Sequence, residues 1–225
     1  MGKRKDKFNK LIYIILAIAI LIFYFVYDET SVDNTPTQES SPPITSPSSD
    51  DLVIHYIDVG QGDATLIQTK SEVMLIDGGE NATEQFLIEY IDDLGISKID
   101  YLIVTHPHSD HIGGLDQIIN TFEIGKVYMP NVTHTSTSFS NLVQSISNKG
   151  LKPNIPKPMD QILMGDTEIV FFNPIRDSYE NLNNYSISLK LTHKNNSFIF
   201  LGDAEKLVET DILDNDYDIS SQVYK

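Results

Sequence analysis

The chain has 225 residues, 40% of them hydrophobic and 21% charged, which is enough for one ordinary domain with a sizeable core. Its 32 acidic residues outnumber 16 Lys and Arg, and the formal net charge of -16 excludes a protein that holds nucleic acid through a broad basic surface. Because the sequence contains no Cys, it excludes disulfide frameworks, thiolate zinc sites and cysteine nucleophiles, and it is compatible with an oxidising compartment.

The N-terminus carries a membrane signal. Residues 1–10 are strongly basic, and residues 11–27 contain no charged side chain. As a helix this apolar run would be roughly 26 Å long at about 1.5 Å per residue, close to the ~30 Å hydrocarbon core of a bilayer. We therefore predict an uncleaved, single-pass transmembrane signal anchor at 11–27, with 1–10 as a cytoplasmic basic tail and the rest of the chain outside the cell. A cleaved secretory peptide is the alternative, but aromatic rather than small residues end the run.

Residues 28–50 are dominated by Ser, Thr, Pro and acidic residues, and they have almost no apolar side chains with which to offset the entropy of ordering. This composition predicts a disordered linker between the membrane anchor and a domain at 51–225. Beyond residue 10, eleven basic and thirty-one acidic residues remain, so the exported part carries about -20 by formal charge.

From residue 51 onward, short apolar runs alternate with amphipathic segments. The longest helical signal is at 84–94, where apolar residues recur at i, i+3, i+4 and i+7 between Thr83 as an N-cap and Gly95 as a stop. Strands are expected at 52–58, 64–69, 73–77, 101–104, 126–129, 167–172, 186–192 and 197–201, and further helices at about 112–122, 139–146 and 205–214. This mixture predicts an α/β layered domain in which helices cover the faces of sheets.

Three of the six histidines fall within six residues, between a buried strand and a helix. In an extended loop, His106 and His108 project to one side, while Asp110 and His111 turn to an adjacent position, so the segment can hold two cations a few ångströms apart. A mixed set of imidazole and carboxylate ligands without sulfur admits Zn, Mn or Fe. A solvated loop that happens to contain histidines is the alternative, and metal binding is the better interpretation.

This segment, at 106–111, matches the HxHxDH signature and so resembles the metallo-β-lactamase fold superfamily. Three further segments, at 55–64, 75–79 and 200–205, look like the metallohydrolase domain of ComEC-type competence proteins, which take up DNA. The similarity runs from about residue 51 to the end of the sequence. The resemblance implies an αββα sandwich and a divalent cofactor, with two zinc ions as the first choice and Mn or Fe as alternatives.

The resemblance also implies a role for each matching residue. His106 and His108 would bind the first metal, Asp110 and His111 the second, and Asp203 would bridge both. Asp203 follows an apolar strand, so a rigid element can deliver its carboxylate to the edge of the sheet where the histidine loop also lies. Asp110 or Asp203 could orient or deprotonate the attacking water, which makes these two the candidate catalytic residues.

Four other polar residues are expected near the site. Asp77 matches the aspartate that supports the histidine loop by hydrogen bonding in this superfamily. Asp58 and Asp63 flank a glycine turn, where they either line the cleft or only stabilise the turn. Asn184 lies in a segment where many superfamily members have a metal-binding histidine, so the first metal is expected to bind weakly.

The remaining histidines are not expected to bind metal. His55 lies within a predicted strand and His193 near a turn, so both are interpreted as structural. His134 lies in a polar stretch, where a solvent-exposed imidazole is the default expectation.

One departure from the family concerns the end of the sequence. In this family, a histidine some twenty to thirty residues after the bridging aspartate completes the second metal site, whereas no histidine follows His193 here. The sequence is therefore expected to be incomplete at its C-terminus, without the closing strands of the second half-sheet, and the activity of this polypeptide is in doubt.

These observations predict a membrane-anchored, extracellular, metal-dependent hydrolase that uses a metal-bound hydroxide on phosphodiester bonds, in DNA or another phosphoester. The charge of about -20 stands against a polyanionic substrate, except where metals locally reverse the field. Two alternatives stay open: a catalytically impaired fragment that binds metal or a partner, and a hydrolase of another exported ester or of a lactam.

Overall fold

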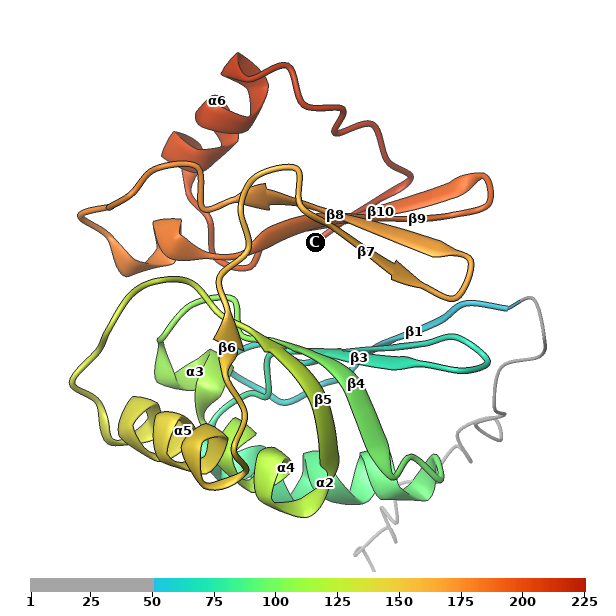
Figure 1. Ribbon diagram of the computed structural model, residues 1–225, viewed down its shortest axis with the longest axis vertical. Helices are drawn as coiled ribbons and strands as arrows, with labels where there is room; N and C mark the ends of the chain where they lie inside the picture. The colour runs from blue at the N-terminus through green and yellow to red at the C-terminus, as the bar shows by residue number, and fades with distance from the viewer. Residues whose placement is uncertain (1–50) are drawn as a thin grey trace, which may run out of the picture. The chain divides into compact units, whose positions relative to one another are not determined.

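The computed structural model describes residues 51–225 (Figure 1). The predicted cytoplasmic tail at 1–10, the membrane anchor at 11–27 and the linker at 28–50 all lie outside the described residues. The described part falls within the second of the two units into which the chain divides, Thr45–Lys225. Among residues 51–225, no helix has both the length and the apolar character needed to cross a membrane.

The first sheet has six strands, which lie side by side in chain order from β1 to β6. The first three pair antiparallel as a meander, and each later strand is parallel to the one before it. The strands are β1 (Val53–Tyr56), β2 (Thr65–Gln68), β3 (Val73–Ile76), β4 (Lys98–Ile103), β5 (Glu123–Tyr128) and β6 (Pro153–Asn154). Parallel pairing requires crossovers, and these crossovers carry the helices that cover the outer face of the sheet.

Three helices, α2, α4 and α5, pack on that outer face (Figure 1), where they bury a large aliphatic cluster against β2, β3, β4 and β5. The helical elements of this half are the 3₁₀ turn η1 (Asn81–Thr83), α2 (Glu84–Asp93), α3 (Ser109–Ile112), α4 (Leu115–Thr121) and α5 (Thr137–Asn148). In α2, Leu87 and Ile91 point into the cluster, as the apolar spacing predicts. In α5, Ser136 is the N-cap, and its hydroxyl accepts a hydrogen bond from the backbone of Phe139.

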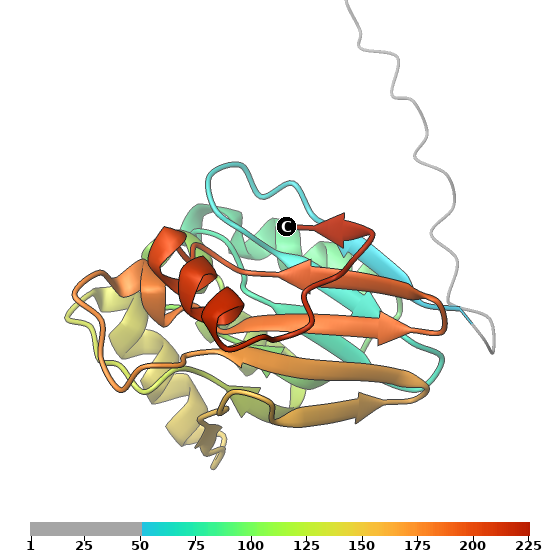
Figure 2. The same ribbon diagram turned by 90° about the horizontal axis from the view of Figure 1, so that it is seen from above.

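The second sheet has five strands in the order β11, β10, β9, β8, β7, all antiparallel except for the β10–β11 pair. They are β7 (Gln161–Met164), β8 (Thr167–Asn173), β9 (Ser188–His193), β10 (Asn196–Phe200) and β11 (Val223–Tyr224), with the 3₁₀ turn η2 (Leu182–Tyr185) between β8 and β9. Helix α6 (Lys206–Asp214) covers part of the outer face (Figure 2).

The two sheets face each other across a second apolar cluster, to which both contribute side chains such as Ile67, Ile103, Phe171 and Leu189. From the first set of helices to α6, the layers are therefore helix, sheet, sheet, helix (Figure 1). The expectation of an α/β sandwich is confirmed, and the structure adds that both sheets are mixed. The transmembrane helix predicted to precede the sandwich falls outside the described residues.

The segment after β4 differs from the sequence expectation of a polar loop at 105–111 and a helix from 112. Helix α3 begins at Ser109, so Asp110 and His111 are already helical, and it ends at Ile112, with Gly113 and Gly114 between it and α4. A Cβ on Gly113 would lie 2.4 Å from the backbone nitrogen of Asn81, and one on Gly114 would lie 2.6 Å from the carbonyl oxygen of Gly78. The two glycines let the chain after β3 pass closely against the histidine segment.

Three short strands were not predicted. Strands β6 and β11 have two residues each, which are too few to show an apolar alternation. Strand β7 has three consecutive apolar residues, so its sequence does not alternate. The expectation that closing strands of the second half-sheet are missing is wrong for β11, which pairs with β10. Its pairing is extended by Lys225, whose backbone N–H donates to Ile199 and whose carbonyl accepts from Leu201.

Candidate metal centre

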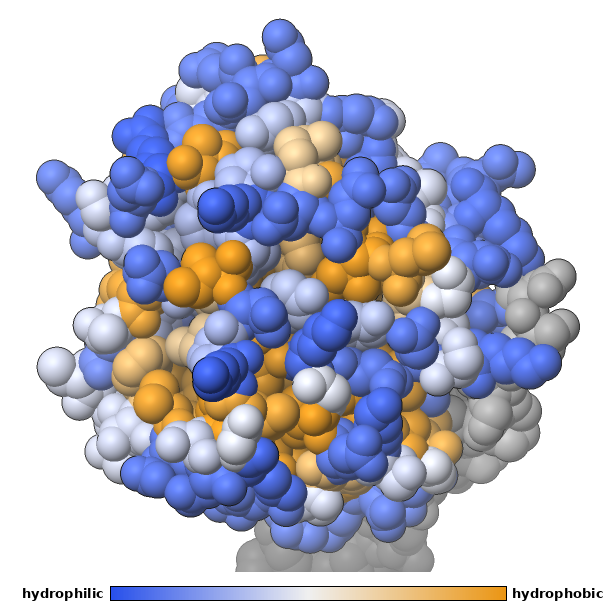
Figure 3. All heavy atoms as spheres, viewed as in Figure 1, coloured by the Kyte–Doolittle hydropathy of each residue, from blue (hydrophilic) through white to orange (hydrophobic). Residues whose placement is uncertain are grey.

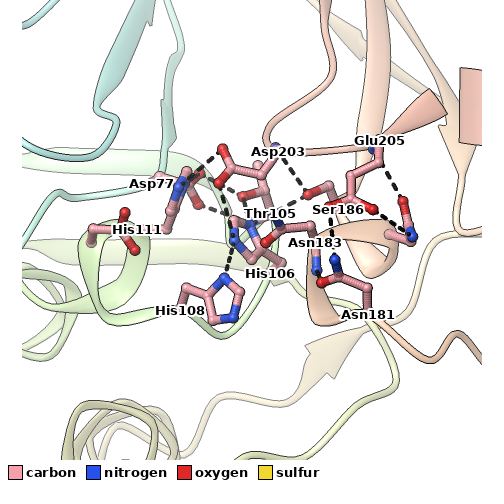
Figure 4. A network of polar contacts seen from close by, with 12 residues as sticks. Asp77, Thr105, His106, His108, His111, Asn181, Asn183, Ser186, Asp203 and Glu205 are labelled. Atoms are coloured by element: carbon pink, nitrogen blue, oxygen red, sulfur yellow. Dashed lines mark hydrogen bonds and ion pairs between the residues drawn. The ribbon is translucent and has the colours of Figure 1, made fainter.

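Two histidines and one aspartate converge where the two sheets meet (Figure 4). Each of His106, His111 and Asp203 offers one possible ligand atom, and these three atoms lie within 4.8 Å of one another. The Asp203 carboxylate faces both rings, with Oδ1 3.3 Å from His111 Nε2 and Oδ2 3.8 Å from His106 Nε2. His106 follows β4, His111 lies in α3 and Asp203 lies in the turn after β10, so the fold joins segments about a hundred residues apart.

A third imidazole borders this group. His108 Nδ1 lies 3.0 Å from His106 Nε2, and the two rings meet edge to face. His108 has an extended backbone conformation, as the N-cap of α3, and is only partly buried, whereas His106 is fully buried. The first two histidines of the motif therefore present different ring nitrogens to one point, Nε2 from His106 and Nδ1 from His108.

Asp77 fixes the orientation of His111. Its buried carboxylate accepts hydrogen bonds from the Thr105 backbone N–H at 2.8 Å, from the Thr105 hydroxyl at 2.6 Å and from His111 Nδ1 at 2.8 Å. The bond to Nδ1 leaves His111 Nε2 facing Asp203. Burial opposes the charged imidazolium, but attraction to Asp77 and hydrogen bonds to Asp203 and Asp77 outweigh it and raise the pKa of His111 to about 10.

The tautomer of His106 follows from its neighbours. The Thr105 hydroxyl gives its proton to Asp77, so at 3.1 Å from His106 Nδ1 it can only accept from the ring. Nδ1 therefore carries the hydrogen and Nε2 the lone pair. Burial, and secondarily the charge of His111, lowers the pKa of His106 to about 4, so this ring is neutral at physiological pH. Its lone pair is thus available to a cation.

Asp203 is also held in its charged form. The hydrogen bond from His111 lowers the pKa of the Asp203 carboxyl below its ordinary value, although partial burial opposes the shift. The Asp203 backbone N–H donates to the Ser186 hydroxyl at 3.1 Å, and this hydroxyl lies 3.3 Å from His106 Nδ1. Ser186 therefore links the two residues. Sequence reasoning noted that asparagine and serine replace a metal-binding histidine of many superfamily members in this segment, but it gave Ser186 no role of its own.

The spacing of these atoms suits a divalent cation. In a tetrahedral site with bonds of about 2.0–2.1 Å, neighbouring ligand atoms are about 3.3 Å apart. The three closest pairs in the cluster are separated by 3.0, 3.3 and 3.8 Å. Imidazole nitrogen and carboxylate oxygen are ligands that zinc, manganese and iron accept. The residues present therefore fit a metal ion, with His106, His111 and Asp203 as the group that the geometry brings together.

Asp110, predicted as a ligand of the second cation, is outside this group. Its carboxylate accepts a hydrogen bond from Gln61 Nε2 at 3.2 Å. The carbonyl oxygen of Asp110 accepts from the Asp63 backbone N–H at 3.2 Å, and a Cβ on Gly62 would lie only 1.8 Å from that oxygen. The glycine turn thus packs directly on α3 and brings Gln61 to Asp110. The ligand role of Asp110 stays a prediction.

The two other aspartates of that turn do not face the cluster. Asp58 is exposed, and its side chain accepts from the Gly60 backbone N–H at 3.0 Å, which is the turn-stabilising alternative. Asp63 Oδ1 forms an ion pair with Lys225 Nζ at 2.7 Å. Neither side chain is among those that the structure brings to the histidines.

Asn184 supports the aspartate turn rather than facing the histidines. It is buried, and its Oδ1 accepts from the Glu205 backbone N–H at 3.0 Å, while its Nδ2 donates to the Glu205 carboxylate at 3.5 Å. These hydrogen bonds fix the position of Glu205, which is two residues after Asp203.

The other three histidines have different surroundings. The His55 ring forms hydrogen bonds with Tyr90 and Gln68. His193 is buried, and its Nδ1 lies 2.8 Å from the Thr167 hydroxyl. These contacts agree with the structural roles predicted for both residues. His134 is only partly exposed, and its ring centroid lies 6.3 Å from that of His108. The expectation of a solvent-exposed ring is therefore wrong for His134, because the loop before α5 folds back toward the metal centre.

The family profile of the metallo-beta-lactamase superfamily matches residues 57–224. The chain belongs to this superfamily, and the match spans both sheets and the cluster of histidines and aspartates.

Individual relatives are distant. ComE operon protein 3 of Bacillus subtilis is 23% identical over 190 residues, which cover 76% of this chain and 24% of the relative. Ribonuclease Z of Haloarcula marismortui is 27% identical over 101 residues, covering 44% of this chain and 31% of the relative. The chain thus spans about a quarter to a third of the length of these curated relatives.

Among solved structures, a metallo-beta-lactamase of Cronobacter sakazakii with a HARLDQ motif superposes with a TM-score of 0.48 at 17% identity, covering 69% of this chain and 62% of the other.

Proposed function

We propose that this chain is a metal-dependent hydrolase of phosphodiester bonds, held at the cell membrane by residues 11–27 with its folded domain outside the cell. The observation that carries the proposal is the convergence of His106, His111 and Asp203, whose ligand atoms lie within 4.8 Å of one another in a chain of the metallo-beta-lactamase superfamily. Zinc is the first choice of metal, with manganese and iron as alternatives.

Each residue of the candidate metal centre has a specific role in this proposal. Divalent cations supply Lewis acidity and can lower the pKa of a water molecule to about 7, so that hydroxide is available at neutral pH. His106 offers a lone pair on Nε2 because Thr105 fixes its tautomer. His111 offers Nε2 because Asp77 holds Nδ1, and the hydrogen bonds to Asp77 keep the ring from rotating.

The carboxylates of Asp203 and Asp110 have the remaining roles in the proposed reaction. Asp203 places one oxygen toward each of His106 and His111, so its carboxylate would help to hold the metal and could accept a proton from the attacking water. Asp110 lies one residue before His111, and its bond to Gln61 fixes the direction of its carboxylate. We assign Asp110 and Asp203 as the residues that orient the attacking water.

A phosphodiester is the preferred substrate for two reasons. A metal held by these residues would supply positive charge that an acidic protein otherwise lacks, and this charge would favour an anionic phosphoryl group. The similarity to ribonuclease Z points in the same direction, as does the resemblance of residues 55–64, 75–79 and 200–205 to ComEC-type proteins.

The test uses the full chain in detergent, stripped with a chelator and reloaded with Zn²⁺, Mn²⁺ or Fe²⁺. We expect metal-dependent hydrolysis of bis(p-nitrophenyl) phosphate and of a fluorescent single-stranded DNA. The rate should fall at least a hundredfold in His106→Ala and Asp203→Ala, and it should be unchanged in Asp58→Asn, whose side chain is exposed and outside the cluster.

Other outcomes separate the alternatives. Metal binding without turnover of either phosphodiester contradicts the proposal and indicates a metal- or partner-binding protein. Turnover of nitrocefin in place of the phosphodiesters indicates a lactam hydrolase. For the location, external protease should remove the folded domain from intact cells, and protection of the domain would contradict the proposed orientation.

A further inference from the structure

The segment that leads into β9 contains three asparagines close to the metal centre. The Asn181 side chain accepts from the Asn183 backbone N–H at 3.0 Å and donates to Glu205 at 2.7 Å. The Asn184 side chain is bonded to Glu205 at both of its polar atoms. The backbone N–H of Ser186 donates to the Asn183 carbonyl at 2.9 Å, which closes the turn. The segment is therefore held firmly, and two of its three amide side chains are already used.

Asn183 differs from its neighbours. Its Oδ1 is buried and has no hydrogen-bond partner, and it is the one buried side-chain oxygen or nitrogen in this condition among residues 51–225. A buried, unsatisfied carbonyl oxygen is unfavourable, because it has lost its hydrogen bonds to water and gained none in the protein. An oxygen left in this state therefore indicates that another group belongs beside it.

Figure 4 shows where that side chain points. It extends from η2 toward His106, away from Asn181 and Glu205. Ser186, one turn further along the chain, reaches the other nitrogen of the same ring at 3.3 Å. Asn183 and Ser186 thus both approach the His106 ring from the second half of the sandwich.

Two groups on this side of the site present electron pairs and therefore cannot donate a hydrogen bond to this oxygen. His106 carries its lone pair on Nε2, since Thr105 accepts the hydrogen on Nδ1. Asp203 is a carboxylate, whose Oδ2 lies 3.8 Å from the same Nε2. His106 Nε2 and Asp203 Oδ2 thus present electron pairs 3.8 Å apart, and a cation can accept these together with an amide oxygen.

We propose that Asn183 Oδ1 is a direct ligand of the cation that His106 and His108 bind. The inference rests on the metal site of the proposed function and adds an amide oxygen to it. Carbonyl oxygen is a harder ligand than imidazole and suits manganese, magnesium and calcium. The amide therefore shifts this position from zinc toward manganese, relative to a site completed by a third histidine.

The experiment titrates the stripped full chain with Co²⁺ and Mn²⁺ by calorimetry, and it follows the visible absorption of bound Co²⁺. Asn183→Leu keeps the volume and removes the oxygen, Asn183→Asp keeps an oxygen, and Asn183→His replaces it with imidazole. Asn148→Leu is the matched control, because Asn148 lies exposed at the end of α5.

We expect Asn183→Leu to weaken one bound cation at least tenfold and to change the Co²⁺ spectrum. Its stripped form should be no less stable to heat than the wild type, because the unsatisfied oxygen is gone. Asn183→Asp should retain affinity, Asn183→His should raise the preference for Zn²⁺ over Mn²⁺, and Asn148→Leu should behave as the wild type.

Unchanged affinity, stoichiometry and Co²⁺ spectrum in Asn183→Leu overturn the inference. If Asn183→Leu does not fold, equal loss of binding in folded Asn183→Asp and Asn183→His overturns it, because a merely structural amide tolerates neither. A wild-type chain that binds no cation contradicts the proposed function itself. The wild type could bind cations and hydrolyse phosphodiesters while Asn183→Leu keeps the same cation affinity. That result contradicts only the ligand role of Asn183.

Discussion

The two halves of the sandwich support the metal centre with unequal amounts of packing. The sheet from β1 to β6 is covered by α2, α4 and α5, whose apolar faces join a cluster of more than twenty buried residues. The sheet from β7 to β11 is covered by α6, over a cluster of five. Both halves have apolar hollows at the surface, one of about 400 Å³ beside α5 and β6 and one of about 230 Å³ between α6 and β11. Figure 3 shows hydrophobic side chains at the surface of the first half.

The two halves also contribute different residues to the metal centre. The first half supplies all three imidazoles and Asp77 from segments next to β3 and β4, which lie deep in the large cluster. The second half supplies Asp203, Ser186 and Asn183 from turns beside β9 and β10. We infer that the first half sets the geometry of the site and that the second half, held by fewer apolar contacts, completes it.

The largest expected effect tests the packing itself. Ile118 in α4 and Ile212 in α6 are both buried isoleucines on a helix that covers a sheet. Ile118→Ala should destabilise the stripped protein by about 4 kcal/mol and Ile212→Ala by about 2 kcal/mol, because a cavity in the thinner layer can collapse more completely. Urea unfolding followed by far-ultraviolet circular dichroism measures both.

The control is Leu213→Ala, since Leu213 is 59% exposed and should change stability by less than about 0.5 kcal/mol. Equal losses in the two isoleucine variants would contradict the inferred difference between the halves.

A smaller effect is expected when one residue that orients the metal centre is changed in each half. Asp77→Asn removes a charged acceptor that holds His111 and Thr105, and it should lower the affinity for the metal tenfold to a hundredfold. Ser186→Ala removes only a neutral hydroxyl beside His106 and should lower affinity less than tenfold, because hydrogen bonds to charged groups are stronger. Competition with a coloured chelator measures both affinities. A larger loss in Ser186→Ala than in Asp77→Asn would reverse the assignment.

The last effect concerns the pH dependence of metal binding. In the metal-free protein the pKa of His111 is raised to about 10, so this ring is protonated at pH 7.5, whereas His106, with a pKa of about 4, is neutral. A cation at His111 Nε2 must displace one proton, so apparent affinity should rise with pH, by up to about tenfold per unit, while His111 remains protonated. Calorimetry between pH 6.5 and 8 in two buffers of different ionisation enthalpy counts the released protons.

Asp77→Asn sharpens this measurement, because loss of the carboxylate lowers the pKa of His111 and should reduce the proton release. Binding that releases no proton in the wild type would show that the cation does not use His111 Nε2.

The helices and longer strands could be predicted because their signals are local. The apolar spacing at 84–94 indicates a helix within one residue of α2, and the apolar run at 101–104 lies at the end of β4. The start of α3 at Ser109 was missed, since its four residues are too few to show a helical period and the glycines that end it serve a contact with the chain after β3.

The sequence by itself determined the superfamily, the alternation of strands and helices, and the histidine segment, because each depends on residues that are neighbours in the chain. The tertiary structure alone decided that Asp203 faces His106 and His111, that Ser186 and Asn183 border the same ring, and that Asp110 turns to Gln61. Such contacts depend on how two sheets pack across an apolar interface, and no periodicity along the chain encodes that distance.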